Sequence, residues 1–135
     1  MKTTHILHII ISLALLAGCS SSGTKHPSQL PKIAQINSTH CYNEDVETLT
    51  NRLNEFLQTC YVASKFSSNT IKIGDIPLGT RISLNTGSAY PYSAELRAGI
   101  NDCKTEAKMY GIDKGWSEAL YQSNLAAYGK AYECP

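Results

Sequence analysis

Residues 43–60 read NEDVETLTNRLNEFLQTC and contain the strongest helical pattern of the chain. Their apolar side chains recur every three or four residues, at Val46, Leu49, Leu53, Phe56, Leu57 and Cys60. This spacing is typical of a helix that buries one face. Asn43 is a suitable N-cap, and the acidic residues after it complement the helix dipole. A helix of this length would keep Cys41 roughly 25 Å or more from Cys60, too far for a disulfide.

Two further helices are expected in the C-terminal third. The first begins at Ser93 as N-cap and ends before Gly111, which fits the C′ position; its apolar residues are Leu96, Ile100, Cys103, Ala107 and Tyr110. The second begins at Asp113 and continues through Trp116, Leu120, Leu125, Tyr128 and Tyr132. The short connection between them predicts an antiparallel helical hairpin. In that hairpin Cys103 and Cys134 would lie roughly 20 Å apart and could not pair.

Between residues 60 and 93 the pattern changes to that of strands. Residues 70–73 and 80–84 alternate apolar and polar side chains, and residues 74–79 supply a turn. They predict a β-hairpin, with residues 32–36 as a candidate third strand. A hairpin alone is only marginally stable, so it must pack on the helices. The expected fold class is α+β: about three helices, two of them an antiparallel hairpin, packed with a small β-hairpin or short sheet and stapled by two disulfides.

The N-terminal segment carries one basic residue, Lys2, followed by a nearly continuous apolar stretch over residues 6–16. Eleven helical residues span roughly 16 Å, about half of a bilayer core, so the segment is a signal peptide rather than a membrane-spanning helix. It ends in Leu16-Ala17-Gly18-Cys19, which resembles the lipobox of bacterial lipoproteins. Beyond this motif we recognise no family in the rest of the chain.

The resemblance implies that residues 1–18 are removed and that Cys19 is lipidated and anchors the chain to a membrane. Ser20 after the cysteine favours the outer membrane of a Gram-negative cell envelope, with the domain in the periplasm. The alternative is an ordinary secretory signal that leaves Cys19 free. Residues 19–38 are rich in Ser, Gly and Pro and predict a flexible tether with an r.m.s. span of about 25 Å. Residues 39–135 then form the globular domain.

Four cysteines remain in this domain: Cys41, Cys60, Cys103 and Cys134. An even number in an exported domain of roughly 95 residues predicts two disulfides. Two connectivities survive the distance arguments. We favour Cys60–Cys103 with Cys41–Cys134, and Cys41–Cys103 with Cys60–Cys134 is the alternative. A metal site is disfavoured because neither a CxxC pair nor a close histidine pair is present.

Composition and motifs exclude several classes of function. The chain has 135 residues, 12 basic and 11 acidic, with a net charge of +1, so it lacks the basic excess typical of nucleic-acid binding. Outside the signal segment the histidines are His26 and His40, and neither a GxSxG nor a HExxH motif accompanies them. The sequence therefore predicts a non-enzymatic protein with no catalytic residue, metal or cofactor.

Tyrosine is unusually frequent, with eight tyrosines against two phenylalanines. Tyrosine and tryptophan are enriched at recognition surfaces because they bury area and keep a polar tip. The candidate partner-binding residues are Tyr90, Tyr92, Trp116, Tyr121 and Tyr128. The alternative is that the aromatic stripe of the third expected helix belongs to the core.

These features favour an outer-membrane-anchored lipoprotein that binds another envelope protein, as an assembly or accessory factor of an envelope machine. The alternative is a periplasmic inhibitor or immunity protein against a toxin or lytic enzyme. The balanced charge gives no support to an acidic inhibitory face. A small hydrolase or ligand carrier would need a pocket that the sequence does not indicate.

Overall fold

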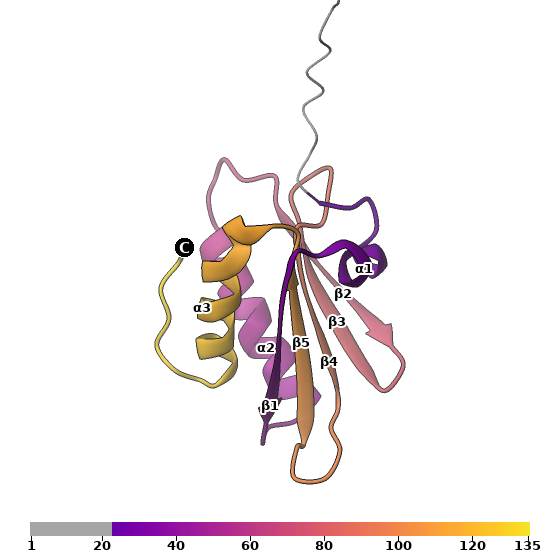
Figure 1. Ribbon diagram of the computed structural model, residues 1–135. Helices are drawn as coiled ribbons and strands as arrows, with labels where there is room; N and C mark the ends of the chain where they lie inside the picture. Colours follow the sequence, from indigo (N-terminus) through magenta and orange to yellow (C-terminus); the bar gives the residue numbers. More distant parts are fainter. Residues whose placement is uncertain (1–22) are drawn as a thin grey trace, which may run out of the picture.

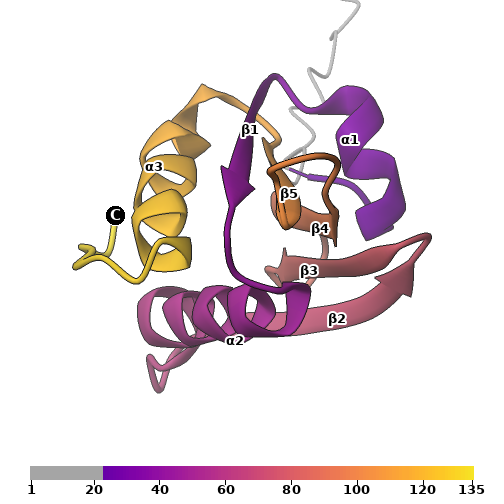
Figure 2. The same cartoon turned by 90° about the horizontal axis from the view of Figure 1, so that it is seen from below.

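A five-stranded antiparallel sheet forms the centre of the structure, a computed structural model that describes residues 23–135 (Figure 1). The strands are β1 (Ile36–Tyr42), β2 (Thr70–Ile76), β3 (Gly79–Asn85), β4 (Tyr92–Ala98) and β5 (Thr105–Gly111). Their order is β1-β5-β4-β3-β2, so β1 and β2 are the two edges. Helices α2 (Val46–Leu57) and α3 (Ser117–Ala127) cover one face, and the short α1 (Leu30–Ile33) lies on the other (Figure 2).

The main core lies between the sheet and the two longer helices. Helix α2 contributes its apolar stripe, Leu49, Leu53, Phe56 and Leu57, all fully buried. The helix predicted from residues 43–60 is therefore present, but its N-cap is Asp45 rather than Asn43. The Asp45 side chain accepts a hydrogen bond of 2.8 Å from the Thr48 N–H. A π-helical turn, η2 (Gln58–Val62), extends it.

The predicted helical hairpin is wrong, and with it the expected fold class. The segment expected as a helix from Ser93 forms β4 and β5, which pair with each other. In β4 the core side chains are Tyr92, Ala94 and Leu96, which alternate as in a strand. Ile100, expected on the apolar face of that helix, lies in the connecting turn with 80% of its surface exposed.

The other expected elements are present in altered form. The predicted β-hairpin exists as β2 and β3, but it is one side of the five-stranded sheet rather than a separate small hairpin. The last helix is shorter than expected: η3 (Lys114–Trp116) follows the predicted cap Asp113, and α3 ends at Ala127. Gly111, expected beyond a helix end, is the last residue of β5.

The described part of the expected tether, residues 23–38, is folded onto the sheet. Thr24 forms a β-bridge with Tyr90, and η1 (Pro27–Gln29) and α1 follow it. Leu30 is fully buried. Of the candidate third strand at residues 32–36, only Ile36 is in a strand: it begins β1, which pairs with β5 instead of the hairpin, whereas residues 32 and 33 belong to α1. The signal segment 1–18 and Cys19 lie outside the described residues.

Two disulfides are present, with the connectivity that we did not favour. Cys41 pairs with Cys103 at a Cα–Cα distance of 5.5 Å, and Cys60 pairs with Cys134 at 5.1 Å. The favoured pairing is wrong, and the helix on which Cys103 was expected is absent. Cys103 instead precedes β5, whose first residue Thr105 pairs with Tyr42 at the end of β1. That register brings Cys103 beside Cys41.

Candidate functional site

A groove of about 290 Å³ runs between the edge strand β1 and helix α3. Strand β1 lies beside α3 at one side of the sheet (Figure 1). The lining residues are Ile36, Asn37, Ser38 and His40 from β1, and Ser117, Leu120, Tyr121 and Asn124 from α3. Most of the exposed lining is apolar, and no Asp, Glu, Lys or Arg belongs to it. The groove therefore suits an uncharged group.

The outer edge of β1 presents backbone groups that the sheet does not pair. The N–H of Gly99 donates to the carbonyl of Lys104, so even-numbered residues of β5 bond to β4 and odd-numbered ones to β1. The register then directs the N–H and C=O of Asn37 and Thr39 away from the sheet. Such unpaired edge groups are a template for another strand.

Several polar side chains lie in or next to the groove, and one of them lacks a hydrogen-bond partner. The Ser38 Oγ is buried and has no hydrogen-bond partner within residues 23–135. The Tyr42 hydroxyl donates to the Asn124 Oδ1 at 2.6 Å and orients that amide. Burial, reinforced by Tyr128, raises the pKa of Tyr42 far above its ordinary value, so it remains a donor. Burial also lowers the pKa of His40, which keeps the ring neutral at pH 7.

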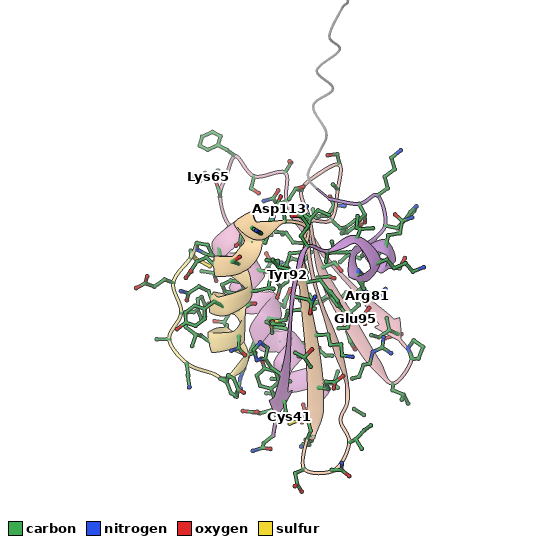
Figure 3. The ribbon with its side chains drawn as sticks, in the orientation of Figure 1. Cys41, Lys65, Arg81, Tyr92, Glu95 and Asp113 are labelled. Atoms are coloured by element: carbon green, nitrogen blue, oxygen red, sulfur yellow. A yellow bond between two sulfur atoms is a disulfide. The ribbon has the colours of Figure 1, made fainter. Side chains whose placement is uncertain are left out.

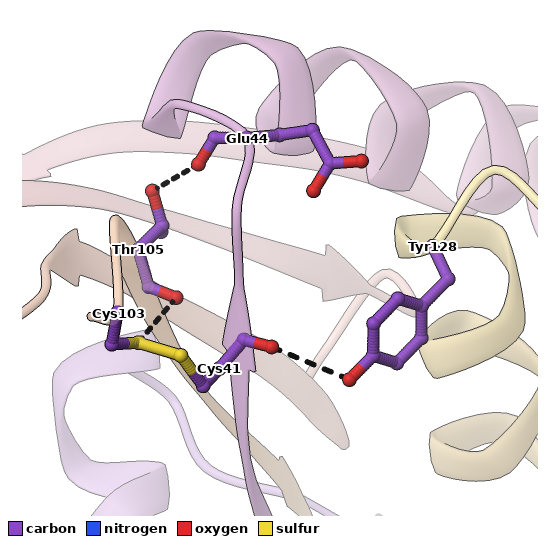
Figure 4. Close-up of a disulfide and its surroundings, with 5 residues drawn as sticks. All are labelled: Cys41, Glu44, Cys103, Thr105 and Tyr128. Atoms are coloured by element: carbon purple, nitrogen blue, oxygen red, sulfur yellow. Dashed lines mark hydrogen bonds between the residues drawn. A yellow bond between two sulfur atoms is a disulfide. The ribbon is translucent and has the colours of Figure 1, made fainter.

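The C-terminal end of β1 is held from three sides (Figure 4). Its Cys41 is tied to Cys103 by the disulfide. The Tyr128 hydroxyl donates to the Cys41 carbonyl at 3.3 Å, and the Thr105 hydroxyl donates to the Glu44 carbonyl at 2.7 Å. These contacts tie the end of β1, and the residues that follow it, to α3 and to β5.

The structure separates the five candidate aromatic residues. Tyr121 is 57% exposed and lines the groove. Tyr128 is partly exposed and rests on the Tyr42 ring, with centroids 4.6 Å apart. Tyr92 is fully buried and offers no surface to a partner. Trp116 stacks on Tyr61 against the core, and Tyr90 bridges to Thr24. Of the five, only Tyr121 lies in the groove.

A second apolar surface lies at the far end of the sheet. Leu78, in the β2–β3 turn, is 78% exposed, and Ile100 is in the neighbouring β4–β5 turn. Both line a cavity of about 280 Å³ with Arg97. Leu78 has a φ of +63°, a conformation that bulky side chains rarely adopt. The edge strand beside this tip is β2, which carries Lys72 and Asp75, and charges on an edge strand discourage pairing, so we rank the tip below the groove.

Several charged groups elsewhere in residues 23–135 are held in ion pairs. Glu95 lies on β4, near the Arg81 side chain of β3 (both are labelled in Figure 3). It accepts hydrogen bonds from Arg81 at 2.6 Å and from Arg97 at 2.9 Å. Burial opposes its ionisation, but the bonds from Arg97 and Arg81 outweigh burial and hold its pKa below the usual value. Within residues 23–135 no three His, Cys, Asp or Glu side chains gather as a metal site would require.

Comparison with known protein families, with curated proteins and with solved structures finds no match to this chain. Among residues 23–135, no helix has the length and apolar character needed to span a bilayer. Of the groove residues, Tyr121 was predicted from the sequence as a candidate binding residue, and the residues of β1 were not. Ile36 and Ser38 fell in the expected tether, where the one available signal was the alternating pattern that continues beyond residue 36.

Proposed function

We propose that this chain is a non-enzymatic lipoprotein, anchored to the outer membrane through Cys19, that binds an extended segment of another envelope protein along β1. The observation that supports it is the unpaired edge of β1 beside an apolar groove. In strand addition, main-chain hydrogen bonds supply affinity and side-chain pockets supply specificity. Binding of this kind fits an assembly or accessory factor of an envelope machine.

The two edges of the sheet differ in how they resist pairing. Strand β2 carries Lys72, Gly74 and Asp75, and charges on an edge strand discourage a second strand. Strand β1 reads INSTHCY and carries neither a charged residue nor a proline. The edge beside the groove is therefore the one that lacks protection, which favours β1 as the binding strand.

The groove also constrains the partner's chemistry. Its lining includes Leu120 and Tyr121 but no carboxylate or permanent cation, so an apolar side chain of the partner is expected there. An acidic surface aimed at a basic lytic enzyme would look different, and the assembly role is the better supported of the two.

Site-specific photo-crosslinking in intact cells tests the proposal. A benzophenone side chain is placed at Tyr121 in the full-length protein, and covalent adducts are identified by mass spectrometry. Thr39→Pro removes one outward N–H of β1, and Pro is tolerated on an edge strand. Thr39→Val keeps that N–H and is the matched control. We expect a discrete adduct that falls about tenfold or more with Thr39→Pro, as the loss of roughly 1.4 kcal/mol predicts, and that persists with Thr39→Val.

Each outcome has a defined meaning. Equal adduct yields from both Thr39 variants would refute strand addition, provided that both accumulate with their disulfides intact. An adduct from a benzophenone at Leu78, with none from Tyr121, would move the site to the exposed tip. An adduct that survives Cys19→Ala would indicate a soluble target and the inhibitor alternative.

A further inference from the structure

The described chain begins close to the residue proposed to carry the lipid. Gly23 is its first residue, and Cys19 lies four positions earlier. Four residues can span at most about 14 Å, even fully extended. The polar headgroup region on each side of a bilayer is itself about 5–7 Å thick. If Cys19 is acylated, the end of the domain that holds Gly23 cannot leave the membrane surface.

The N-terminal segment cannot lengthen this connection without disrupting packing. The Tyr90 N–H donates to the Thr24 carbonyl at 2.8 Å, next to the start of the chain. A Cβ atom added at Gly23 would lie 2.8 Å from the Ala89 Cβ, so the backbones approach closely. Peeling the segment away would expose the buried Leu30. The chain is therefore fastened to the sheet within two residues of its first described position.

The loop over residues 63–69 lies at this same end. It leads into β2, whose first residue Thr70 pairs with Asn85, and residues 86–91 then return to the Thr24 bridge. Figure 3 places Lys65 at the end where the described chain begins. The neighbouring Phe66 is 99% exposed. A single exposed apolar residue does not by itself indicate an interaction site. Phe66, however, projects from the end of the domain that the proposed anchor holds at the membrane.

Charge contributes less than this aromatic side chain. Lys25, Lys65 and Lys114 lie in the segments at this end, but so do Asp113 and Glu118. Their near balance gives little attraction to an anionic surface. An aromatic ring beside a lysine can enter the interface while the ammonium group stays among the headgroups. Contact by Phe66 therefore does not require anionic lipid.

From these observations we propose that the 63–69 loop lies against the membrane, with the Phe66 ring inserted at the boundary between headgroups and acyl chains. This inference rests on the proposed lipid anchor at Cys19. It sets the orientation of the domain: the Gly23 end faces the lipid and the Leu78 tip points away. The occupant of this surface is the bilayer that holds the anchor.

Depth-dependent fluorescence quenching tests the orientation. The full-length lipidated protein is reconstituted into phosphatidylcholine vesicles with and without brominated acyl chains. Phe66→Trp and Leu78→Trp each add one tryptophan, at an exposed apolar position, to the single native Trp116. The unsubstituted protein gives the contribution of Trp116. We expect brominated lipid to quench the added emission at position 66, with a blue shift, and to leave the emission at position 78 unchanged.

Flotation of the same vesicles separates the two hypotheses. Protein that fails to float with the vesicles overturns the lipid anchor and the orientation together. Protein that floats but shows no added quenching at position 66 overturns the orientation alone. Equal quenching at positions 66 and 78 also overturns it, because the domain would then tumble freely. The absence of quenching at 78, together with strong quenching at 66, supports the proposed orientation.

Discussion

Leu30→Ala tests whether the N-terminal segment is part of the fold, on which the short membrane connection depends. Leu30 is fully buried on the face of the sheet opposite α2 and α3, and it lies outside the main core cluster. Removing a buried leucine side chain costs about 2.7–5 kcal/mol where the surroundings cannot collapse. A four-residue helix at the periphery can shift, so we expect about 2–3 kcal/mol. Most of that loss should fall on the docking of residues 23–34 rather than on global unfolding.

Hydrogen exchange of the full-length protein measures this loss directly. Two amides report on docking: Ala34 donates to the Leu30 carbonyl, and Tyr90 donates to the Thr24 carbonyl. A loss of 2–3 kcal/mol predicts that both exchange about 30- to 150-fold faster. The amides of β4 and β5 should change much less. Ile33→Ala is the control, because Ile33 is in the same helix but is 52% exposed.

Hydrogen exchange of the unsubstituted protein can by itself refute the docking of residues 23–34. If its Ala34 and Tyr90 amides exchange at the rate of an unstructured chain, the segment is a tether and the argument from linker length fails. If Leu30→Ala accelerates exchange of the β4 amides as much as exchange of the Ala34 and Tyr90 amides, the segment and the sheet unfold together. In that case the docking is real but is not a separate local unit.

Two further predictions concern what stabilises the domain. Replacing Cys60 and Cys134 together by alanine removes the disulfide that closes a loop of 74 residues, which should lower the free energy of unfolding by about 4 kcal/mol. A urea midpoint equal to that of the unsubstituted protein would contradict this. Glu95→Gln should cost about 2 kcal/mol at pH 7, because ionised Glu95 accepts from two arginines. Its folded pKa lies below the usual 4.5, so this stabilisation is present above about pH 4.5 and is lost as the pH falls through the folded pKa. The urea midpoints of the two proteins should therefore converge as the pH falls through that folded pKa, and a difference that stays constant would show that the ion pairs are not its source.

The parts of the fold that sequence predicts are those in which one periodicity dominates. Residues 46–57 carry a helical stripe that agrees with the buried face of α2. The alternation at residues 70–73 and 80–84 matches β2 and β3. In these segments the local pattern and the tertiary environment require the same structure. Prediction there needs no knowledge of distant residues.

The prediction of a helical hairpin failed because a spacing of four residues between apolar side chains fits both a helix and a strand. Leu96 and Ile100 are four apart, and a strand places such residues on one face as a helix does. The distinguishing signal was the turn over residues 99–102, where Asn101 adopts a φ of +57°. Buried Ala94 and Leu96 show strand alternation, but alanine favours helices in isolation. Pairing with β3 and β5 overrides that preference, and sequence separation hides those partners.

The candidate site could be predicted only on its helical side, for a related reason. A groove between an edge strand and a helix exists only when the strand order is known, and β1 pairs with a strand about seventy residues later in the chain. The same long-range pairing decides the disulfides, since Cys103 reaches Cys41 only through the β1–β5 register. Tyr121 was among the candidate partner-binding aromatic residues, but its partners across the groove could not be predicted.

The groove and the proposed membrane contact together restrict where a partner can lie. Strand β1 begins at Ile36, at the end that holds Gly23, and runs away from it for seven residues (Figure 1). Seven strand residues cover about 20 Å. With a connection of at most about 14 Å, the whole groove remains within about 35 Å of the lipid. A segment added to β1 would then run roughly along the membrane normal, with one end near the headgroups. That geometry favours a periplasmic segment of a protein that is itself held at the outer membrane over a target that diffuses freely.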